Sequence, residues 1–371
     1  MQESIYMANR RGRDSAAKRA KRKRRRVIIF VLEIIILIGV LGALLVVLKL
    51  DKADTGNKES VINAKVNDEV AEQVEAQDNS WKMSGYKNIA LFGVDSRDGN
   101  LDKGARTDTI IVASLNNETG DITLCSIFRD TYLNVGNDTY NKANQAYAKG
   151  GPEQAIQMLN ANLDMDITDY ITVDFRALVD MIDDVGGVEI DITDEEIHFL
   201  NDYQIGTAEA IGIPQSEIVN VSSAGMQTLN GLQATSYCRI RYTKGDDFKR
   251  AERQRMVLMQ VADKARTADV STLNEIIDDI LPKVRTSFSK SDLVEYASRA
   301  ASYNIGESSG FPFERVTGNM GKAGSSVVAD NFEANVVEFH RFLFGDSEYT
   351  PSQTVQSISE KVAADRMKNG L

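Results

Sequence analysis

The chain has 371 residues, of which 42% are hydrophobic, enough for a buried core and too many for a disordered protein. Five prolines and the lack of a low-complexity run exclude collagen-like and proline-rich architectures. Two cysteines exclude a disulfide scaffold, and two histidines are too few for a His-rich metal site.

Charge is divided unevenly along the chain. Residues 1–26 carry eleven Lys and Arg against two acidic residues, a net charge of +9, whereas 27–371 carries −20. Such asymmetry indicates a basic tail for nucleic acid or for a membrane. The next segment, 27–48, reads VIIFVLEIIILIGVLGALLVVL and has Glu33 as its only charge. A helix of this length spans about 33 Å, enough for a bilayer core of about 30 Å.

Three interpretations of this N-terminus compete. A cleaved signal peptide has a shorter apolar core and a small-residue cleavage site, which this stretch lacks. A DNA-binding arm explains the bases but not the apolar run. A single-pass anchor explains both, so we predict a basic cytoplasmic tail over 1–26, a transmembrane helix over 27–48 and everything after it outside the cell.

The exported part begins with a polar segment. We predict that 49–85 is a solvated extracellular stalk, although Ile62, Val66, Val70 and Val74 recur every four residues and leave room for a short helix. Beyond it, apolar runs that end at glycine or at turn residues predict strands. The predicted strands are 87–94, 107–116, 122–128 and 188–192.

Helical patterns alternate with these strands. Pro152 after two glycines suits a first helical turn, and Asp246 or Asp247 can cap a long helix. This mixture indicates a layered α/β domain over 86–345, a central mixed β-sheet flanked by helices, followed by a mobile C-terminal tail over 346–371. The predicted helices are 152–163, 174–185, 246–268, 274–281, 291–303 and 331–345.

Arginines gather at the ends of the predicted elements. Arg239 and Arg241 are two apart in a predicted strand and would project from one face. Arg250 and Gln254 are four apart in the first turns of a helix, where free amides and the dipole favour anions. Guanidinium groups match phosphate oxygens, and several converging on one site need a highly charged anion such as pyrophosphate. The alternative is a set of separate surface ion pairs, each contributing little. The seven clustered arginines are Arg97, Arg106, Arg129, Arg239, Arg241, Arg250 and Arg253.

Two carboxylates lie in the same segments. Asp95 follows a predicted strand and Asp108 begins another. Mg²⁺ prefers one or two carboxylates together with phosphate oxygens, although aspartate in such places is more often a turn former. Cys125 and Cys238 each precede a clustered arginine in a predicted strand. We interpret both as small buried hydrophobes, with a disulfide as the alternative, and expect Cys238 to face away from the arginines.

Seven strings in order make the pattern specific. The chain resembles the LytR–CpsA–Psr family of membrane-anchored cell-wall glycopolymer ligases over about 86–345. It departs from the usual family pattern at Phe128, where a proline is usual, and in KANQAY, where KINAAY is usual. The matching strings are NIALFGVDSRDG, ARTDTIIVASLN, ITLCSIFRDTYLNV, YNKANQAYAKGGPEQAI, ITDYITVDF, MIDDVGGVEIDI and QTLNGLQATSYCRIRYTKGDDFKRAERQ.

The resemblance implies a reaction and its partners. Family members move a glycopolymer from an undecaprenyl pyrophosphate carrier to peptidoglycan, or in some members to protein, through a phosphodiester. They do so at the outer face of the membrane and without nucleic acid. It implies Mg²⁺ or Mn²⁺ on Asp95 and Asp108, and catalytic roles for these two with Arg97 and Arg129. Asp95 is a candidate base, though a metal-bound carboxylate is a poor one. The residues implied to bind pyrophosphate are Arg97, Arg129, Lys142, Asn144, Arg239, Arg241, Arg250 and Gln254.

Two other functions stay open at this point. A pyrophosphatase would use the same residues, with water in place of the sugar hydroxyl. A non-enzymatic membrane-bound regulator of envelope genes would place the basic tail on DNA, but the anchor speaks against it. Apolar helix residues are core by default, and the resemblance allows some to line a lipid tunnel. Those considered are Ile156, Leu159, Leu163, Leu178 and Ile182.

Overall fold

The computed structural model describes most of the chain after residue 64. The predicted cytoplasmic tail and transmembrane helix lie outside the described residues, and the helices predicted over 274–281 and 291–303 lie mostly outside them. Within the described part, no helix combines the length and apolarity needed to cross a membrane. The described residues are 54–55, 65–76, 82–96, 100–241, 243, 246–267, 280, 283–288, 292, 296, 299 and 302–371.

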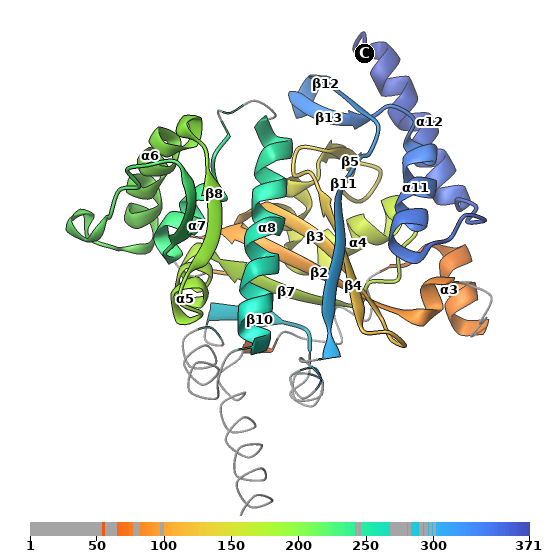
Figure 1. Ribbon diagram of the computed structural model, residues 1–371. Helices are drawn as coiled ribbons and strands as arrows, with labels where there is room; N and C mark the ends of the chain where they lie inside the picture. The colour runs from red at the N-terminus through yellow and green to blue at the C-terminus, as the bar shows by residue number, and fades with distance from the viewer. Residues whose placement is uncertain are drawn as a thin grey trace, which may run out of the picture. The chain divides into compact units, whose positions relative to one another are not determined.

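A seven-stranded mixed sheet forms the centre of the fold (Figure 1). β7 lies parallel to β2, β3 lies antiparallel to both β2 and β4, and β11 lies parallel to β4. The fold class predicted from the sequence is therefore confirmed for the described domain. In spatial order the strands are β1 (Asp54–Thr55), β10 (Val284–Thr286), β7 (Asp169–Asp174), β2 (Tyr86–Asp95), β3 (Arg106–Asn116), β4 (Asp121–Ile127) and β11 (Asn304–Phe311).

The three long central strands match the predicted ones to within a residue. Their side chains alternate between two apolar faces, because successive Cβ atoms of a strand point to opposite sides. Ile110 and Val112 of β3 join the core around α4 (Asn144–Leu163), whereas Ile111 and Ala113 pack with residues of α8 (Asp246–Thr267). Both faces are covered, so the strands read as nearly continuous apolar runs.

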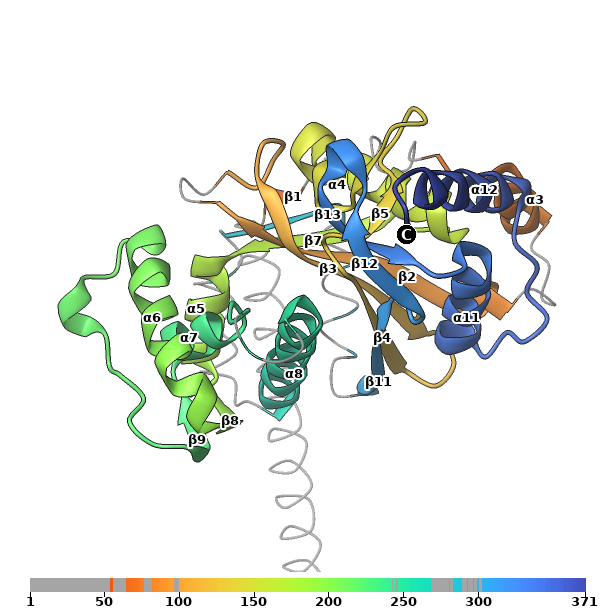
Figure 2. The ribbon, with the colours of Figure 1, turned by 90° about the horizontal axis from the view of Figure 1, so that it is seen from above.

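Helices cover both faces of the central sheet. Figure 2 shows α4 and α8 on opposite sides of the sheet. α4 is longer than predicted and is kinked where Gly150 and Gly151 leave helical geometry, so Pro152 stands in the first turn of its second half. The core on the α4 side also contains residues of α11 (Phe332–Phe344), the predicted C-terminal helix.

A smaller layer lies beyond the α8 face. The predicted strand 188–192 is confirmed as β8 (Val188–Ile192), but it pairs with β9 (Gly225–Leu229) in a separate two-stranded sheet. The residues of this layer form their own apolar cluster with part of α8. Its helices are α5 (Phe175–Asp184), α6 (Asp194–Ile211) and α7 (Gly231–Tyr237), with the short turn η2 (Gln215–Glu217).

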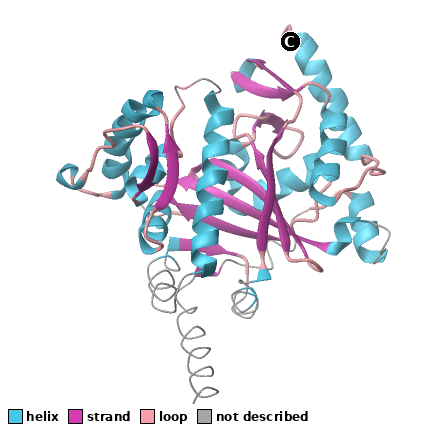
Figure 3. Ribbon diagram, in the orientation of Figure 1, coloured by secondary structure: helices cyan, strands magenta, loops and turns pink. Residues whose placement is uncertain are grey.

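Two further hairpins lie near the end of the sheet where β4 finishes (Figure 3). A parallel bridge joins Thr131, which precedes the first hairpin, to Val327 in the second. The hairpins are β5 (Tyr132–Asn134) with β6 (Tyr140–Lys142), and β12 (Arg315–Asn319) with β13 (Ser325–Ala329), whose connection contains η5 (Gly321–Ala323).

The prediction of a mobile C-terminal tail is wrong. Residues 353–368 form α12 (Gln353–Lys368), and Val355, Ile358 and Val362 are buried in the core beside α4. Their spacing places them on one helical face. Burial of three aliphatic side chains stabilises a helix that its polar sequence did not reveal.

The predicted stalk also differs from the structure near its end. The four-residue spacing does form a helix, α3 (Asp68–Ala76), followed by η1 (Lys82–Gly85). Val70 is buried in the core, and the side-chain amide of Asn67 donates from Nδ2 to the Ala161 carbonyl of α4 at 3.2 Å. The folded domain therefore begins before residue 86 because this helix packs on it.

His340 makes the stability of this core depend on pH. Its Nε2 bonds the Leu163 carbonyl at 2.8 Å and its ring stacks on Tyr349 at 3.6 Å. Burial lowers the pKa of His340 from 6.5 to about 4, against the opposing influence of Asp164 and Asp346. Because the unfolded state takes up the proton first, this contribution is complete above pH 6.5 and is lost as the pH falls from 6.5 to about 4.

We therefore expect acidification to pH 4 to remove about 3 kcal/mol of unfolding free energy through His340. Denaturant unfolding of wild type and His340→Asn at both ends of this window measures the difference. The variant should be less stable at neutral pH and should lose less on acidification. Equal pH dependence in the two proteins would contradict this assignment.

Candidate functional site

Several predicted site residues lie at one edge of the central sheet. β2 ends at Asp95, β3 begins at Arg106, and β4 ends just before Arg129. Because β3 runs antiparallel to both neighbours, these three positions meet at the same edge. Segments far apart in sequence are thus brought together by topology alone.

A β-bulge presents Asp108 at this edge. Gly93 pairs with Thr109 and Val94 with Thr107, so Asp108 is the extra residue in β3. A bulge bends the strand and redirects the extra side chain. The Asp108 carboxylate accepts a hydrogen bond from Nη1 of Arg129, which joins the start of β3 to the end of β4.

A cavity of about 640 Å³ opens beside this edge, between the sheet and α5 and α8. Seven predicted site residues line it, so the structure confirms that they converge. Arg97 lies outside the described residues. The seven are Asp95, Asp108, Arg129, Arg239, Arg241, Arg250 and Gln254.

The rest of the cavity wall is mostly apolar. Leu178, one of the residues considered for a lipid tunnel, does line it. Ile156, Leu159 and Leu163 are instead fully buried in the core around α4, and Ile182 is buried in the smaller layer. A cavity lined by several arginines and by many apolar side chains suits an amphiphile with an anionic head. The main apolar wall residues are Leu91, Ile111, Ile171, Val173, Phe175, Leu178, Met181, Val257 and Leu258.

Arg239 is held in place by three side chains. Its guanidinium lies 4.6 Å from the ring centre of Phe175 and 5.8 Å from that of Tyr203, and its Nη1 donates to Thr207 Oγ1 at 2.8 Å. These contacts orient the planar guanidinium of Arg239. The sequence pattern predicted Arg239 as a site residue but did not identify Phe175 and Tyr203 as its partners. No spacing in the sequence links Tyr203 of α6 to Arg239.

The strand predicted around Arg239 and Arg241 is wrong. The Asn230 and Gln233 side chains form a capping box that starts α7, and the chain then leaves the helix through turns. The Cys238 and Arg239 amides bond the carbonyls of Ala234 and Ser236 at 3.0 Å each. Both arginines still line the cavity.

The cysteines are confirmed as buried and unpaired. Burial raises the pKa of Cys125 and of Cys238 to about 12, so neither thiol is reactive at neutral pH. Cys125 lies in β4 as predicted, but Cys238 caps α7 and lines the cavity, contrary to the expectation that it faces away. Strand alternation does not apply to a turn.

α8 carries arginines with different roles. Arg250 and Gln254 share the face that lines the cavity, as their spacing predicts, and Gln254 Nε2 donates to the Cys238 carbonyl at 3.4 Å. Arg253, counted with the cluster, is instead buried against Glu196, with Nε and Nη2 at 3.0 and 2.7 Å from one carboxylate oxygen. Arg106, counted with the cluster but not assigned to the site, does line the cavity.

Lys142 and Asn144 line an adjoining pocket of about 340 Å³, which shares Arg106 and Arg129 with the main cavity. The backbone N–H of Asn144 donates to the backbone carbonyl of Arg129 at 3.0 Å. The prediction that these two residues lie near the arginines is therefore confirmed, although they contact a neighbouring space.

Asp95 and Asp108 are the candidate ligands for a hard cation. Among the described residues, no three His, Cys, Asp or Glu side chains gather as a metal site. Asp95 and Asp108 both line the cavity beside the arginines. Two carboxylates are the protein share that Mg²⁺ usually takes when phosphate supplies the other oxygens, so the donor set fits a metal that arrives with an anionic ligand.

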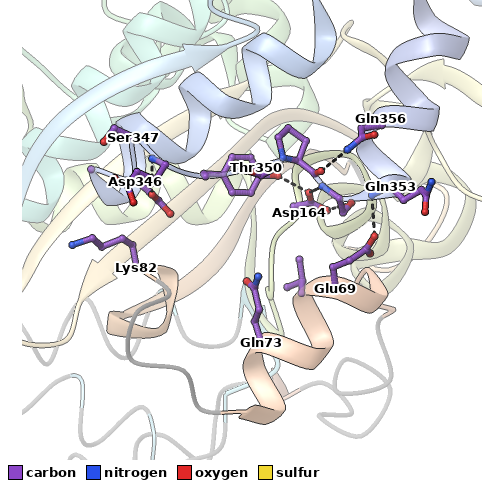
Figure 4. Close-up of a pocket in the computed structure, with 15 residues that line it drawn as sticks. Glu69, Gln73, Lys82, Asp164, Asp346, Ser347, Thr350, Gln353 and Gln356 are labelled. Atoms are coloured by element: carbon purple, nitrogen blue, oxygen red, sulfur yellow. Dashed lines mark hydrogen bonds between the residues drawn. The ribbon is translucent and has the colours of Figure 1, made fainter.

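A second cavity, of about 870 Å³, lies between α3 and the loop before α12 (Figure 4). Its described lining contains four carboxylates against one lysine, Lys82, and no arginine; the carboxylates are Glu69, Asp164, Asp346 and Glu348. The Asp164 carboxylate at its wall is occupied by Ser352, whose amide and hydroxyl donate to it at 2.8 and 2.6 Å. An acidic wall repels phosphate, so this larger cavity is not the candidate site.

Comparison with known proteins finds relatives in sequence and in fold. One similar protein is the polyisoprenyl-teichoic acid–peptidoglycan teichoic acid transferase TagU of Enterococcus faecalis, 28% identical over 267 residues, covering 70% of this chain and 82% of that protein. Two solved structures share the fold. TagT bound to LI-WTA is 18% identical with a TM-score of 0.54, and covers 78% of this chain and 93% of that one. The protein YwtF (TagT) with bound octaprenyl pyrophosphate lipid is 17% identical with a TM-score of 0.50, over the same shares.

A family model settles the classification. The model for the LytR_cpsA_psr family matches residues 46–335, more than three quarters of the chain. This range contains every described residue of the arginine-lined cavity. The chain therefore belongs to the LytR–CpsA–Psr family.

Proposed function

We propose that this protein transfers a glycopolymer from an undecaprenyl pyrophosphate carrier to peptidoglycan, forming a phosphodiester bond. The single observation that carries the proposal is the convergence of Arg129, Arg239, Arg241 and Arg250 on one cavity whose remaining wall is mostly apolar. A polyprenyl pyrophosphate has the matching chemistry, with a dianionic head and a long apolar chain.

The relatives support this choice of substrate. TagU is named for a polyisoprenyl-linked teichoic acid donor and a peptidoglycan acceptor, and TagT has a solved structure with octaprenyl pyrophosphate. The family classification allows the same chemical class here.

The reaction is a phosphoryl transfer. An acceptor sugar hydroxyl attacks the phosphorus next to the glycan, the bond to the bridging oxygen breaks, and undecaprenyl phosphate leaves with the electron pair. Arg129, Arg239 and Arg250 neutralise charge on the transferred phosphoryl and on the leaving group, which is most of what such a step needs. In this proposal Arg97, Arg241 and Gln254 complete the pyrophosphate site, and Lys142 and Asn144 border it.

Metal binding is part of the proposal. Asp95 and Asp108 would hold Mg²⁺ or Mn²⁺, which would add positive charge beside the phosphate oxygens. Arg129 already pairs with Asp108. It would thus align the carboxylate beside the phosphate oxygens. The hydroxyl proton has Asp95 as its candidate acceptor.

The apolar segment 27–48 supports a membrane location for the protein. We propose that residues 27–48 anchor the chain in the cell membrane, with 1–26 in the cytoplasm and the domain described here outside. Such an anchor keeps the cavity close to a lipid-borne substrate and makes membrane lipid a direct neighbour.

One assay tests the proposed function. The full chain in detergent is given a polyprenyl pyrophosphate-linked oligosaccharide, peptidoglycan oligomers and Mg²⁺, and the products are separated by mass. We expect an oligosaccharide joined to peptidoglycan through one phosphate, and loss of product on chelation. Release of free phosphorylated oligosaccharide at the same rate with and without acceptor would instead identify a pyrophosphatase.

A further inference from the structure

Two aromatic rings and one guanidinium meet outside the cavity, where three elements come together. Phe128 follows β4, Phe248 lies in the first turn of α8, and Arg315 begins β12. The two rings meet edge to face, with 4.7 Å between their centres. The Arg315 guanidinium lies 3.9 Å from the ring centre of Phe248 and 4.9 Å from that of Phe128. We call these three residues the aromatic clamp, and none of them lines the cavity.

Two residues of the clamp stand next to arginines of the proposed pyrophosphate site. Phe128 directly precedes Arg129 in the chain, and Phe248 lies two residues before Arg250. Both arginines line the cavity. The clamp therefore joins the end of the strand that presents one site arginine to the start of the helix that presents the other.

α8 presents different faces to the clamp and to the cavity. Phe248 and Ala251 are three residues apart and pack with Phe128 in one apolar cluster. Arg250 and Gln254 are four apart and line the cavity from another face. The first N–H groups of a helix have no partner within it, so the position of its opening turn depends on such packing. The side chains that hold this turn are thus separate from those that would meet the substrate.

Phe128 is itself fixed by the edge strand β11. Its N–H donates to the Phe311 carbonyl at 3.1 Å, and a Cβ added to Gly310 would come within 2.5 Å of its ring. The proline that is usual in the family at this position has neither an N–H nor an aromatic ring. The clamp is therefore built from the residue at which this chain departs from the family pattern.

Arg315 is fixed by the backbone in front of it. Its Nη1 donates to the carbonyls of Pro312 and Phe313 at 2.9 Å each. These bonds orient the guanidinium plane, and planar stacking on rings suits arginine better than lysine. Figure 1 shows the β12–β13 hairpin beside the start of α8, which agrees with the contact between Arg315 and Phe248.

We propose that the aromatic clamp sets the distance between Arg129 and Arg250 before the pyrophosphate binds, and that Arg315 is therefore a positioning residue for the transfer reaction. The inference rests on the proposed function, in which both arginines bind one pyrophosphate. Cations that are already correctly spaced need no rearrangement when the anion arrives, whereas a displacement of about 1 Å can cost about a hundredfold in rate. Arg315 acts through Arg250 and does not touch the substrate.

Two ligands and a double-mutant cycle test the clamp. The ligands are octaprenyl pyrophosphate and octaprenol, which has the same apolar chain and no phosphate. The full-length proteins in detergent are wild type, Arg315→Met, Arg315→Lys, Arg250→Gln, the double variant Arg315→Met/Arg250→Gln and the control Arg341→Met. Arg341 is an exposed arginine of α11 that pairs with Glu338 and does not line the cavity. Dissociation constants for both ligands and kcat for transfer are measured at a temperature at which circular dichroism shows the proteins folded.

We expect Arg315→Met to weaken binding of octaprenyl pyrophosphate by about fivefold and to lower kcat by about tenfold, with octaprenol binding unchanged. Arg315→Lys should lie between, because lysine keeps the charge but loses the planar stacking. In the Arg250→Gln background, Arg315→Met should change pyrophosphate binding much less, because the side chain that the clamp positions is absent. Arg341→Met should behave as wild type. If Arg315→Met does not fold, Arg315→Lys takes its place in the cycle.

Other outcomes overturn the inference. Equal weakening of both ligands, or a lower melting temperature with unchanged binding and kcat, would show that the clamp supports the fold without positioning the arginines. An effect of Arg315→Met that is the same with and without Arg250 would show that it does not act through that residue. The proposed function is judged separately by wild type. If wild type binds octaprenyl pyrophosphate well and Arg315→Met has no effect, only the clamp is wrong; if wild type binds it no better than octaprenol, the proposed donor site itself is rejected.

Discussion

Replacing Arg239 by glutamine should lower kcat/KM for glycopolymer transfer by a factor of about a hundred to a thousand. The guanidinium is oriented before substrate arrives, by the Phe175 ring and by Thr207, and it lines the cavity where charge would develop. A preorganised cation gives more transition-state stabilisation than one that must be reoriented. Transfer rates measured over a range of donor concentrations separate kcat from KM.

Arg239→Lys separates charge from geometry. Lysine keeps the positive charge but loses the planar fork and the stacking on Phe175 and Tyr203. We therefore expect an activity between those of wild type and Arg239→Gln.

Arg176→Gln is the matched control. Arg176 lies next to Phe175 on α5, its side chain is 44% exposed, and it pairs with Asp180 at 3.4 Å, away from the cavity lining. It should retain wild-type transfer. Wild-type activity of a folded Arg239→Gln, checked by circular dichroism, would remove Arg239 from the mechanism.

The sequence revealed the sheet and the ends of its strands because both leave strong local signals. Apolar runs such as 107–116 predict buried strands, and β3 begins and ends within a residue of that range. Charged residues at strand ends need no knowledge of packing to be located. Once β2, β3 and β4 pair antiparallel, Asp95, Arg106 and Arg129 must meet at one edge.

Features that depend on distant partners were not predictable. The run Cys238–Arg239–Ile240–Arg241 alternates like a strand, but the α7 capping box and the turns that follow α7 determine its backbone. α12 has only a few apolar residues within a polar segment, so its helix depends on the core it covers. Likewise Phe175 reads as an ordinary helix residue until Arg239 is placed over its ring.

The second large effect concerns stability. Replacing Arg253 by methionine should lower the free energy of unfolding by about 3–5 kcal/mol. Arg253 and Glu196 are both buried, with side chains 4% and 9% exposed, and Arg253 also donates to Thr243 Oγ1 at 2.8 Å. Removing the cation leaves a buried carboxylate without its partner, which costs more than the pair contributes by itself.

Glu196 serves two elements at once. Its Oε2 accepts from the Thr193 amide and hydroxyl at 3.0 and 2.9 Å, which caps α6, while Oε1 accepts from Arg253 of α8. Burial alone would raise the pKa of Glu196, but the hydrogen bonds from Thr193 and Arg253 lower it below its ordinary 4.5. The contribution of the pair is therefore complete above pH 4.5 and is lost as the pH falls through the folded value.

Denaturant unfolding of the full chain in detergent measures the loss, with Lys249→Met as the control on the same helix. Lys249 and Glu252 form a half-exposed pair at 2.9 Å, and breaking it should change stability by only about 0.5 kcal/mol. Adding Glu196→Gln to Arg253→Met should recover part of the loss, because no buried charge remains. Equal effects of Arg253→Met and Lys249→Met would show that the buried pair does not stabilise the fold.

The same substitution should also affect activity at high temperature. α8 carries Arg250 and Gln254 on its cavity face, so unfolding of this helix removes both residues from the site. Arg253→Met should therefore lower the temperature at which transfer activity is lost, while kcat at low temperature stays nearly unchanged.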